Sequence, residues 1–173
     1  MSRAENTRHA RGRAVIIRGA RTPFVRAFGD LTRVDTIALG ATAVRGVLEK
    51  VGLSYKVVDG IVWGGVILPS ASPNVAREIA LDDGVGAACE GMTVTRACAS
   101  GLQAITLAAA AIERGEADVL IAGGSDSTSN AEIKLPQRVV HALAPLALGK
   151  PTPADVLGAL AQLAPFTDVL PKA

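Results

Sequence analysis

The chain has 173 residues, enough for one domain with a sizeable hydrophobic core. Hydrophobic residues make up 49% of it but aromatic residues only 3%, so this core must consist of small and branched aliphatic side chains. A net charge of +2 is too small to indicate a nucleic-acid-binding protein. The two cysteines, Cys89 and Cys98, form neither a disulfide framework nor a zinc-binding C-x-x-C pair.

The N-terminal residues 1–13 contain four arginines and no apolar run, so they do not resemble a secretory signal peptide, and we expect a flexible tail. The longest apolar run, residues 104–112, is too short to span a bilayer. We therefore expect an intracellular chain without a transmembrane segment. The cytoplasm is its expected location, with the mitochondrial matrix as the alternative.

Strands and helices are predicted to alternate from residue 14 onward. Residues 14–19 are a β-branched run that ends at glycine, which is typical of a buried strand. Apolar residues at helical spacing predict a helix over 37–51, followed by a C-cap glycine. Residues 57–68 predict a second strand, and 74–81 predict a short helix that begins at an asparagine N-cap.

The same alternation continues with a third strand at 92–95, a helix at 99–114 and a fourth strand at 118–122. It predicts an α/β protein with a mostly parallel, helix-covered sheet. Further along, prolines separate short segments rich in leucine and alanine, of which 135–148 and 154–163 predict helices. No strand is predicted there, so we expect the sheet to lack a closing strand.

Cys98 is the candidate functional residue because it falls at the junction of a predicted strand and a predicted helix. N–H groups at a helix start have no intrahelical partner, and the helix dipole is positive there, so both favour a thiolate. The Cys98 N–H is also placed to donate to a developing oxyanion. The alternative is a small buried hydrophobic residue, the commoner role of a free cysteine. Position in the sequence leaves both interpretations open.

The helix that follows Cys98 is apolar on nearly all sides, through Leu102, Ile105, Leu107, Ala109 and Ile112. A helix of this kind is expected in the middle of a layered structure. We therefore expect a nucleophile at its tip to be reached only through a pocket or channel.

The run C-A-S-G-L-Q-A-I at 98–105 resembles the active-site signature of thiolases. Three further segments resemble thiolase motifs in the expected order: R-T-P-F at 21–24, P-N-V-A-R at 73–77 and G-G-S-D-S-T-S-N at 123–130. The second departs from the family pattern because Val75 replaces a proline. Ketoacyl synthases share a Cys-Ala-Ser segment but lack the R-T-P-F opening.

The resemblance implies a layered α/β fold of the thiolase type, of which this chain forms the N-terminal half, with a mixed, mostly parallel sheet and helices on both faces. It implies a flexible tail at 1–13, an N-terminal thiolase domain with an incomplete sheet at 14–130, and the truncated start of a helical loop domain at 131–173. That last segment resembles the loop domain of the β-subunits of fatty-acid oxidation complexes.

The resemblance also implies an acyltransferase of fatty-acid metabolism. The Cys98 thiolate attacks the keto carbon of a 3-ketoacyl-CoA, acetyl-CoA leaves, and coenzyme A takes the acyl group from Cys98; acetyl-CoA condensation is the reverse. Acyl-CoA and coenzyme A are then the substrates, and no metal or redox cofactor is implied. Other thiolase subunits, in a homo- or hetero-oligomer, are the implied protein partners.

Other thiolase groups are not matched: the Gly-His-Pro histidine that activates the nucleophile, the Cys-x-Gly cysteine, and the asparagine of an Asn-Glu segment. His9 and His141 do not fit the first motif. Cys89 precedes a glycine at the right spacing, but it lies before the nucleophile, and we interpret it as a coincidence. Loss of general acid–base catalysis costs about 10²–10⁴-fold per group, so we expect little or no turnover from the chain alone.

Two alternative interpretations remain. One is a non-catalytic half that associates with a separate thiolase chain. The other is a truncated product without a stable fold, since the predicted sheet lacks its last strand.

Overall fold

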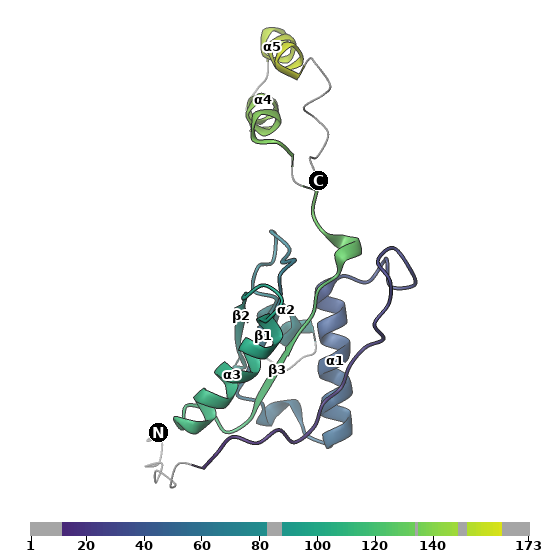
Figure 1. Cartoon of the computed structure of the whole chain (residues 1–173). Helices are drawn as coiled ribbons and strands as arrows, with labels where there is room; N and C mark the ends of the chain where they lie inside the picture. The colour runs from purple at the N-terminus through teal and green to yellow at the C-terminus, as the bar shows by residue number, and fades with distance from the viewer. Residues whose placement is uncertain (1–11, 83–87, 134, 149–151, 164–173) are drawn as a thin grey trace. The chain divides into compact units, whose positions relative to one another are not determined.

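The computed structural model describes residues 12–82, 88–133, 135–148 and 152–163 (Figure 1). The chain falls into two compact units, Met1–Ala131 and Glu132–Ala173. Most of the expected flexible tail lies outside the described residues. None of the helices in the described ranges combines the length and the apolar character that crossing a bilayer requires.

The first unit is built around three parallel strands, β1 (Gly60–Gly64), β2 (Glu90–Val94) and β3 (Leu120–Gly124), in the order β2-β1-β3. All five residues of β1 are buried, as expected for the central strand. The strands pair residue for residue, so their last residues lie opposite one another and their carboxyl ends share one edge. The predicted parallel sheet is confirmed. The central strand β1 is shorter than the predicted strand 57–68, whereas β2 and β3 lie within two residues of the predicted strands 92–95 and 118–122.

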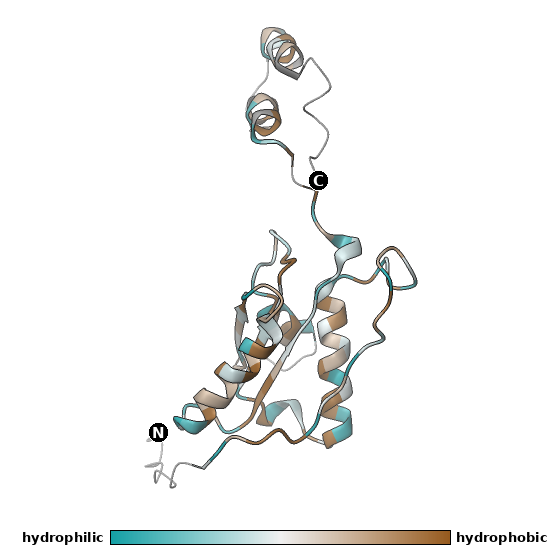
Figure 2. Cartoon of the chain, viewed as in Figure 1, coloured by the Kyte–Doolittle hydropathy of each residue, from teal (hydrophilic) through white to brown (hydrophobic). Residues whose placement is uncertain are grey.

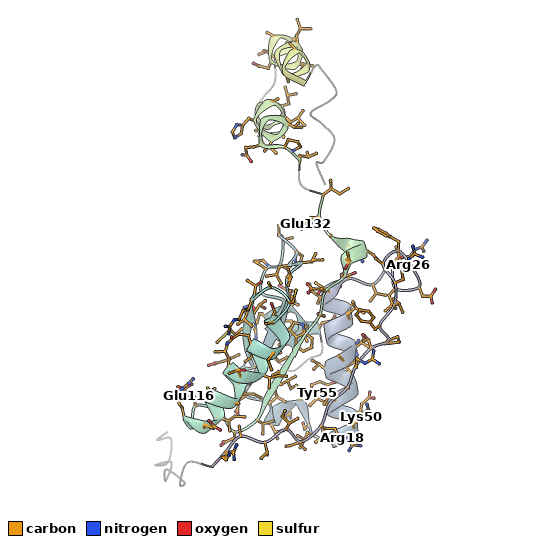
Figure 3. All side chains as sticks on the ribbon, in the orientation of Figure 1. Arg18, Arg26, Lys50, Tyr55, Glu116 and Glu132 are labelled. Atoms are coloured by element: carbon orange, nitrogen blue, oxygen red, sulfur yellow. The ribbon has the colours of Figure 1, made fainter. Side chains whose placement is uncertain are left out.

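Helices cover both faces of this sheet, as the sequence predicted (Figure 1). The helix α3 (Ser100–Glu113) packs on one face, whereas α1 (Thr36–Val51) and α2 (Val75–Asp82) lie on the other. Charged side chains stay outside these layers; Lys50 and Glu116, for example, are exposed (Figure 3).

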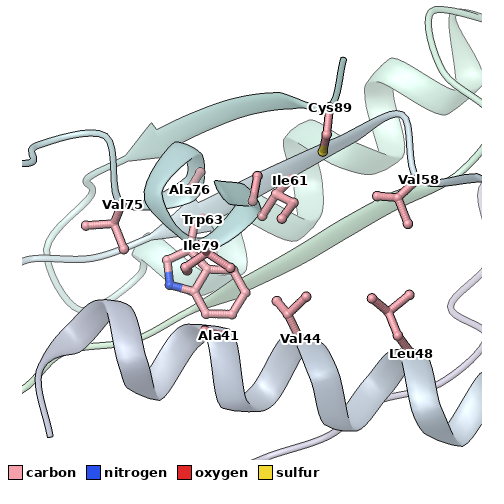
Figure 4. Packing of buried hydrophobic residues seen from close by; sticks show 11 residues of the cluster. Ala41, Val44, Leu48, Val58, Ile61, Trp63, Val75, Ala76, Ile79 and Cys89 are labelled. Atoms are coloured by element: carbon pink, nitrogen blue, oxygen red, sulfur yellow. The ribbon is translucent and has the colours of Figure 1, made fainter. Parts of the chain in front are cut away.

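The main hydrophobic core lies between β1 and the pair α1–α2 (Figure 4). Successive strand side chains point to opposite faces, so Ile61 and Trp63 join this core while Val62 points the other way. Val62 packs against Ala104 and Ala108 of α3. Both faces of β1 are therefore covered mainly by aliphatic side chains, and Trp63 is an aromatic exception to the aliphatic core that composition predicted.

The helix ends follow the capping signals in the sequence. The Asp35 carboxylate accepts the Ala38 N–H at 2.8 Å and begins α1. Gly52 ends the helix with φ 69°, a left-handed conformation that glycine adopts without strain. The predicted asparagine cap of α2 is also present, because the Asn74 side-chain oxygen accepts the Arg77 N–H at 3.3 Å.

Residues 14–19 do not form the predicted buried strand. They pair with no strand of the described chain, and Val15, Ile16 and Ile17 are 76%, 80% and 69% exposed. A β-branched run becomes a strand through cross-strand pairs and burial, and here it lacks both. The segment is held instead by its end, where the Ala14 N–H donates to the Glu113 carboxylate at 3.3 Å.

The second unit contains the two predicted helices, α4 (Gln137–Leu148) and α5 (Pro153–Leu163). The two helices pack against each other, and Val139, Ala142 and Ala159 are buried. The role of this unit as the start of a thiolase loop domain stays a prediction.

We predict that Gly64→Ala destabilises the first unit. A Cβ atom at Gly64 would lie 2.4 Å from the Ser100 carbonyl carbon and 2.6 Å from the Gly101 nitrogen, so α3 must move off the sheet. Overpacking of this kind costs about 1–3 kcal/mol. Urea unfolding followed by circular dichroism measures the loss.

Gly101→Ala is the matched control because a Cβ at Gly101 meets no atom within 4 Å. It lies in the first turn of the same helix, where alanine is favoured over glycine by about 0.5–1 kcal/mol. Equal stability of the two variants would contradict the close seating of α3 on β1.

Candidate active site

The segments that follow the three strands meet at the carboxyl edge of the sheet, where α/β proteins place their functional sites. The Gly65 N–H donates to the Val94 carbonyl at 3.1 Å, which joins the segment after β1 to the last residue of β2. The Ser125 N–H donates to the Gly64 carbonyl at 3.1 Å, which joins β1 to the segment after β3. The three loops therefore form one connected edge.

Cys98 lies on this edge, in the turn of residues 95–99 between β2 and α3. Its side chain is exposed. The turn is tight: the Ala99 N–H donates to the Arg96 carbonyl at 3.1 Å, and Ala97 has a left-handed φ of 47°. The interpretation of Cys98 as a buried hydrophobic residue therefore does not hold in this structure.

The helix α3 begins at Ser100, two residues after Cys98, close to the start that the sequence predicted. Its N-cap residue, Ala99, makes no side-chain capping hydrogen bond. The Ser100 N–H at this end donates to the Ala97 carbonyl at 3.1 Å, and the helix dipole is positive there. This end of α3 therefore favours a negative charge that develops beside Cys98, such as that of an oxyanion.

The expectation that α3 is enclosed on all sides is wrong for the described chain. Ser100, Ala104 and Ala108 are its buried residues and face the sheet, whereas Leu102 and Ile105 are 67% and 39% exposed. Figure 2 shows hydrophobic residues on this helix away from the sheet. Small side chains allow α3 to pack closely on β1, and Leu102 and Ile105 lie on its other side. Cys98 is correspondingly open rather than at the end of a channel.

Cys89 has the opposite environment. It is 4% exposed and belongs to the main hydrophobic core (Figure 4). Burial raises the pKa of the Cys89 thiol, and the nearby Arg77 guanidinium opposes this only in part. Cys89 thus has the properties of a structural cysteine, in agreement with its Cys-x-Gly match being a coincidence.

No acid–base partner for Cys98 is identified among the described residues. His141 is exposed on α4, in the second unit, and its Nε2 lies 3.0 Å from the Gln137 amide nitrogen. His9 lies outside the described residues. Across the described ranges, no three His, Cys, Asp or Glu side chains cluster in a way that would hold a metal ion. That the protein needs no cofactor stays a prediction.

The segment 123–130, noted for its resemblance, fixes the carboxyl edge through side-chain hydrogen bonds. The Trp63 indole N–H donates to the Ser125 hydroxyl at 2.8 Å, and that hydroxyl donates to the Thr36 carbonyl at 2.8 Å. The Asn130 amide donates to the Val34 carbonyl at 3.1 Å. The segment after β3 is therefore bound to β1 and to the start of α1.

The P-N-V-A-R segment has a similar structural role beside β2. The Asn74 amide donates to the Gly91 carbonyl at 3.0 Å, and its oxygen accepts the Thr93 hydroxyl at 3.0 Å. The Arg77 guanidinium donates to the Cys89 carbonyl at 2.9 Å. The replacement of the family proline by Val75 leaves this attachment intact, and Val75 is fully buried.

Asp126 joins the loop after β1 to the loop after β3. Its Oδ1 accepts the N–H groups of Val66 and Ile67 at 2.8 and 2.6 Å. We predict that Asp126→Ala lowers the free energy of unfolding by about 1–2 kcal/mol, since two hydrogen bonds to a charged acceptor are lost. Hydrogen exchange should speed up at the two amides it releases.

Asp59 is the matched control, because its Oδ2 accepts two backbone N–H groups, from Asp118 and Val119, at 2.8 and 2.9 Å. It does so at the start of β1 and not at the carboxyl edge. Asp59→Ala should cost a similar amount of stability without loosening the edge. Faster exchange at Val66 in both variants would show that Asp126 has no specific role there.

A family model described as the N-terminal domain of thiolase matches residues 14–157. The chain is 35% identical over 147 residues to the 3-ketoacyl-CoA thiolase of Shewanella denitrificans, covering 84% of this chain and 34% of that protein. It is 37% identical over 144 residues to the 3-ketoacyl-CoA thiolase of Shewanella sediminis, covering 83% and 33%. The chain therefore spans about a third of the length of these curated relatives.

Two solved structures are similar as well. The acetyl-CoA acetyltransferase of Bacillus anthracis aligns with a TM-score of 0.66 at 30% identity, covering 68% of this chain and 30% of that one. A thiolase from Ascaris suum, solved in complex with coenzyme A, aligns with a TM-score of 0.66 at 26% identity, covering 69% and 31%. Together with the match over 14–157, these similarities show that the chain belongs to the thiolase family and corresponds to its N-terminal domain.

Proposed function

We propose that this chain supplies the acyl-accepting part of a thiolase-type acyltransferase, with Cys98 as the nucleophile. The observation that carries the proposal is an exposed thiol in a tight turn at the uncapped N-terminus of α3. The relatives named 3-ketoacyl-CoA thiolase and the neighbour that binds coenzyme A support acyl-CoA and coenzyme A as its substrates.

The proposed reaction has two steps through a thioester. The Cys98 sulfur attacks the keto carbon of a 3-ketoacyl-CoA, and the tetrahedral oxyanion collapses with cleavage of the Cα–Cβ bond. The electron pair leaves on acetyl-CoA as its enolate, which takes up a proton. The coenzyme A thiol then attacks the acyl-Cys98 thioester, releases the shortened acyl-CoA and restores Cys98. The positive end of the α3 dipole stabilises the oxyanions.

Proton transfer is the part of the reaction for which we assign no residue. The described histidine, His141, is hydrogen bonded to Gln137 in the second unit. We therefore propose that the chain works with a polypeptide that supplies the rest of a thiolase, and that it has little turnover by itself. We propose fatty-acid β-oxidation in the cytoplasm as its setting, because a 3-ketoacyl-CoA, the substrate in the relatives' name, is an intermediate of fatty-acid breakdown.

Complementation tests this proposal. The chain is mixed with the part of the Shewanella denitrificans thiolase outside the matched segment, here called the complementing polypeptide. We expect coenzyme A-dependent cleavage of a 3-ketoacyl-CoA by the mixture (the complemented assembly) and not by either component alone. Formation of a stable complex that transfers no acyl group would contradict the proposed function.

The second candidate is a non-catalytic half that associates with a separate thiolase chain. It is favoured by the exposed apolar side chains on the outer face of α3, Leu102 and Ile105, which a partner would cover. Size-exclusion chromatography of the complemented assembly, followed by mass spectrometry of the Cys98 peptide in the eluted complex, distinguishes the two candidate functions. Co-elution with no acyl group on Cys98 would support the non-catalytic role.

A further inference from the structure

Ser100 is a buried polar residue at the start of α3, with 4% exposure. A serine near a helix N-terminus ordinarily caps it, accepting a hydrogen bond from an N–H further along the helix. The Ser100 hydroxyl reaches backward instead. It accepts the Arg96 N–H at 2.8 Å and donates to the Ala97 carbonyl at 2.7 Å.

These two hydrogen bonds close a loop of residues 96–100 with Cys98 at its centre. The Ala97 carbonyl also accepts the Ser100 backbone N–H at 3.1 Å, so Ser100 donates two hydrogen bonds to this carbonyl. Ala97 needs this support because its φ of 47° is left-handed, which is costly for a residue with a Cβ. Strained backbone of this kind persists only where its surroundings over-determine it.

The other side of Ser100 is fixed by the sheet. Gly64 of β1 approaches so closely that a Cβ there would lie 2.5 Å from the Ser100 carbonyl oxygen. The main chain of Ser100 therefore packs against β1, while its hydroxyl is hydrogen bonded to the turn. Any relaxation of the turn has to occur on the side of Ala97 and Cys98, which is exposed.

We propose that Ser100 is a positioning residue for Cys98: its hydroxyl keeps the left-handed turn at Ala97 closed and so holds the thiol at the N-terminus of α3. The inference rests on the proposed function of Cys98 as the acyl acceptor. It assigns Ser100 no contact with the substrate.

The test is the rate at which iodoacetamide labels Cys98 in the full chain, measured by mass spectrometry with Cys89 as internal reference. Ser100→Ala should slow Cys98 labelling by roughly 10- to 30-fold, since the turn loses two hydrogen bonds of ordinary strength. Ser100→Thr keeps the hydroxyl and should restore most of the rate.

Thr106→Ala is the matched control, because it removes a hydroxyl that donates to the Leu102 carbonyl at 2.9 Å on the exposed side of the same helix. Cys98 labelling should be unchanged in this variant. Cys89 lies in the hydrophobic core, so general unfolding would raise its labelling rate, whereas a change of the turn would not.

Ala97→Gly gives a second route to the same answer, because glycine adopts a left-handed φ without strain. In an Ala97→Gly/Ser100→Ala double variant the turn no longer depends on the hydroxyl, and we expect Cys98 labelling to recover. Unchanged labelling in Ser100→Ala, or no recovery in the double variant while Cys89 stays protected, would overturn the inference. Slow Cys98 labelling in the unmodified chain would instead reject the proposed function.

Discussion

Cys98→Ala is expected to abolish acyl transfer by the complemented assembly. The variant removes the sulfur that carries the acyl group between the two half-reactions, and no other exposed thiol is found among the described residues. Loss of a covalent nucleophile lowers turnover by roughly 10⁴-fold or more. Coenzyme A-dependent cleavage of a 3-ketoacyl-CoA measures the loss.

Cys89→Ala is the matched control for this experiment. It makes the same chemical change at the buried cysteine, so it should lower stability while leaving the acyl transfer of the folded assembly intact. Retained turnover in Cys98→Ala, or equal loss in both variants, would reject Cys98 as the acyl acceptor.

The second large effect is a difference in thiol reactivity within one chain. Iodoacetamide should label Cys98 at least about 10²-fold faster than Cys89 near neutral pH, because a buried thiol reacts only after local opening and about 1.4 kcal/mol of opening free energy is worth tenfold. Cys89 is at a further disadvantage, since burial raises its pKa and keeps it protonated. Peptide mapping at successive times gives both rates.

Urea provides the control for this comparison. As the chain unfolds, Cys89 leaves the hydrophobic core and the two labelling rates should converge. Equally slow labelling of both cysteines in the folded chain would contradict an accessible thiol at the start of α3.

The elements were predictable wherever the signal was local. The amphipathic pattern of α1, its glycine C-cap at Gly52 and the Asn74 cap of α2 each depend on residues within one or two turns. The order of strands and helices then restricted the fold to a parallel sheet with helices on both faces. Cys98 was placed at a strand–helix junction by the same reasoning, and the structure confirms that position.

Two features depended on neighbours that the sequence pattern does not reveal. Residues 14–19 have strand propensity, but no strand of the described chain pairs with them, so they form no strand and 15–19 are exposed. The helix α3 is apolar nearly all round, yet its fully buried residues are the small ones and Leu102 stays exposed. Composition indicates that a surface is apolar, whereas its burial depends on what packs against it.

The side chains that hold the candidate site were the least predictable part. Ser125, Asp126 and Ser100 were noted only because they fall within segments that resemble thiolase motifs. Their hydrogen bonds join positions far apart in the sequence, such as Trp63 and Ser125, or run backward over a turn, as in Ser100. Polar residues near glycines indicate a turn, but only coordinates show which groups they bind.

The most direct test is to expose the complemented assembly to acetyl-CoA, digest it and locate the acetyl group by mass spectrometry. A sulfur that carries acyl groups at a helix tip should gain one acetyl group at Cys98 and lose it again when free coenzyme A is added. An unmodified Cys98 peptide, or a stable acetyl group at another residue, would contradict this account.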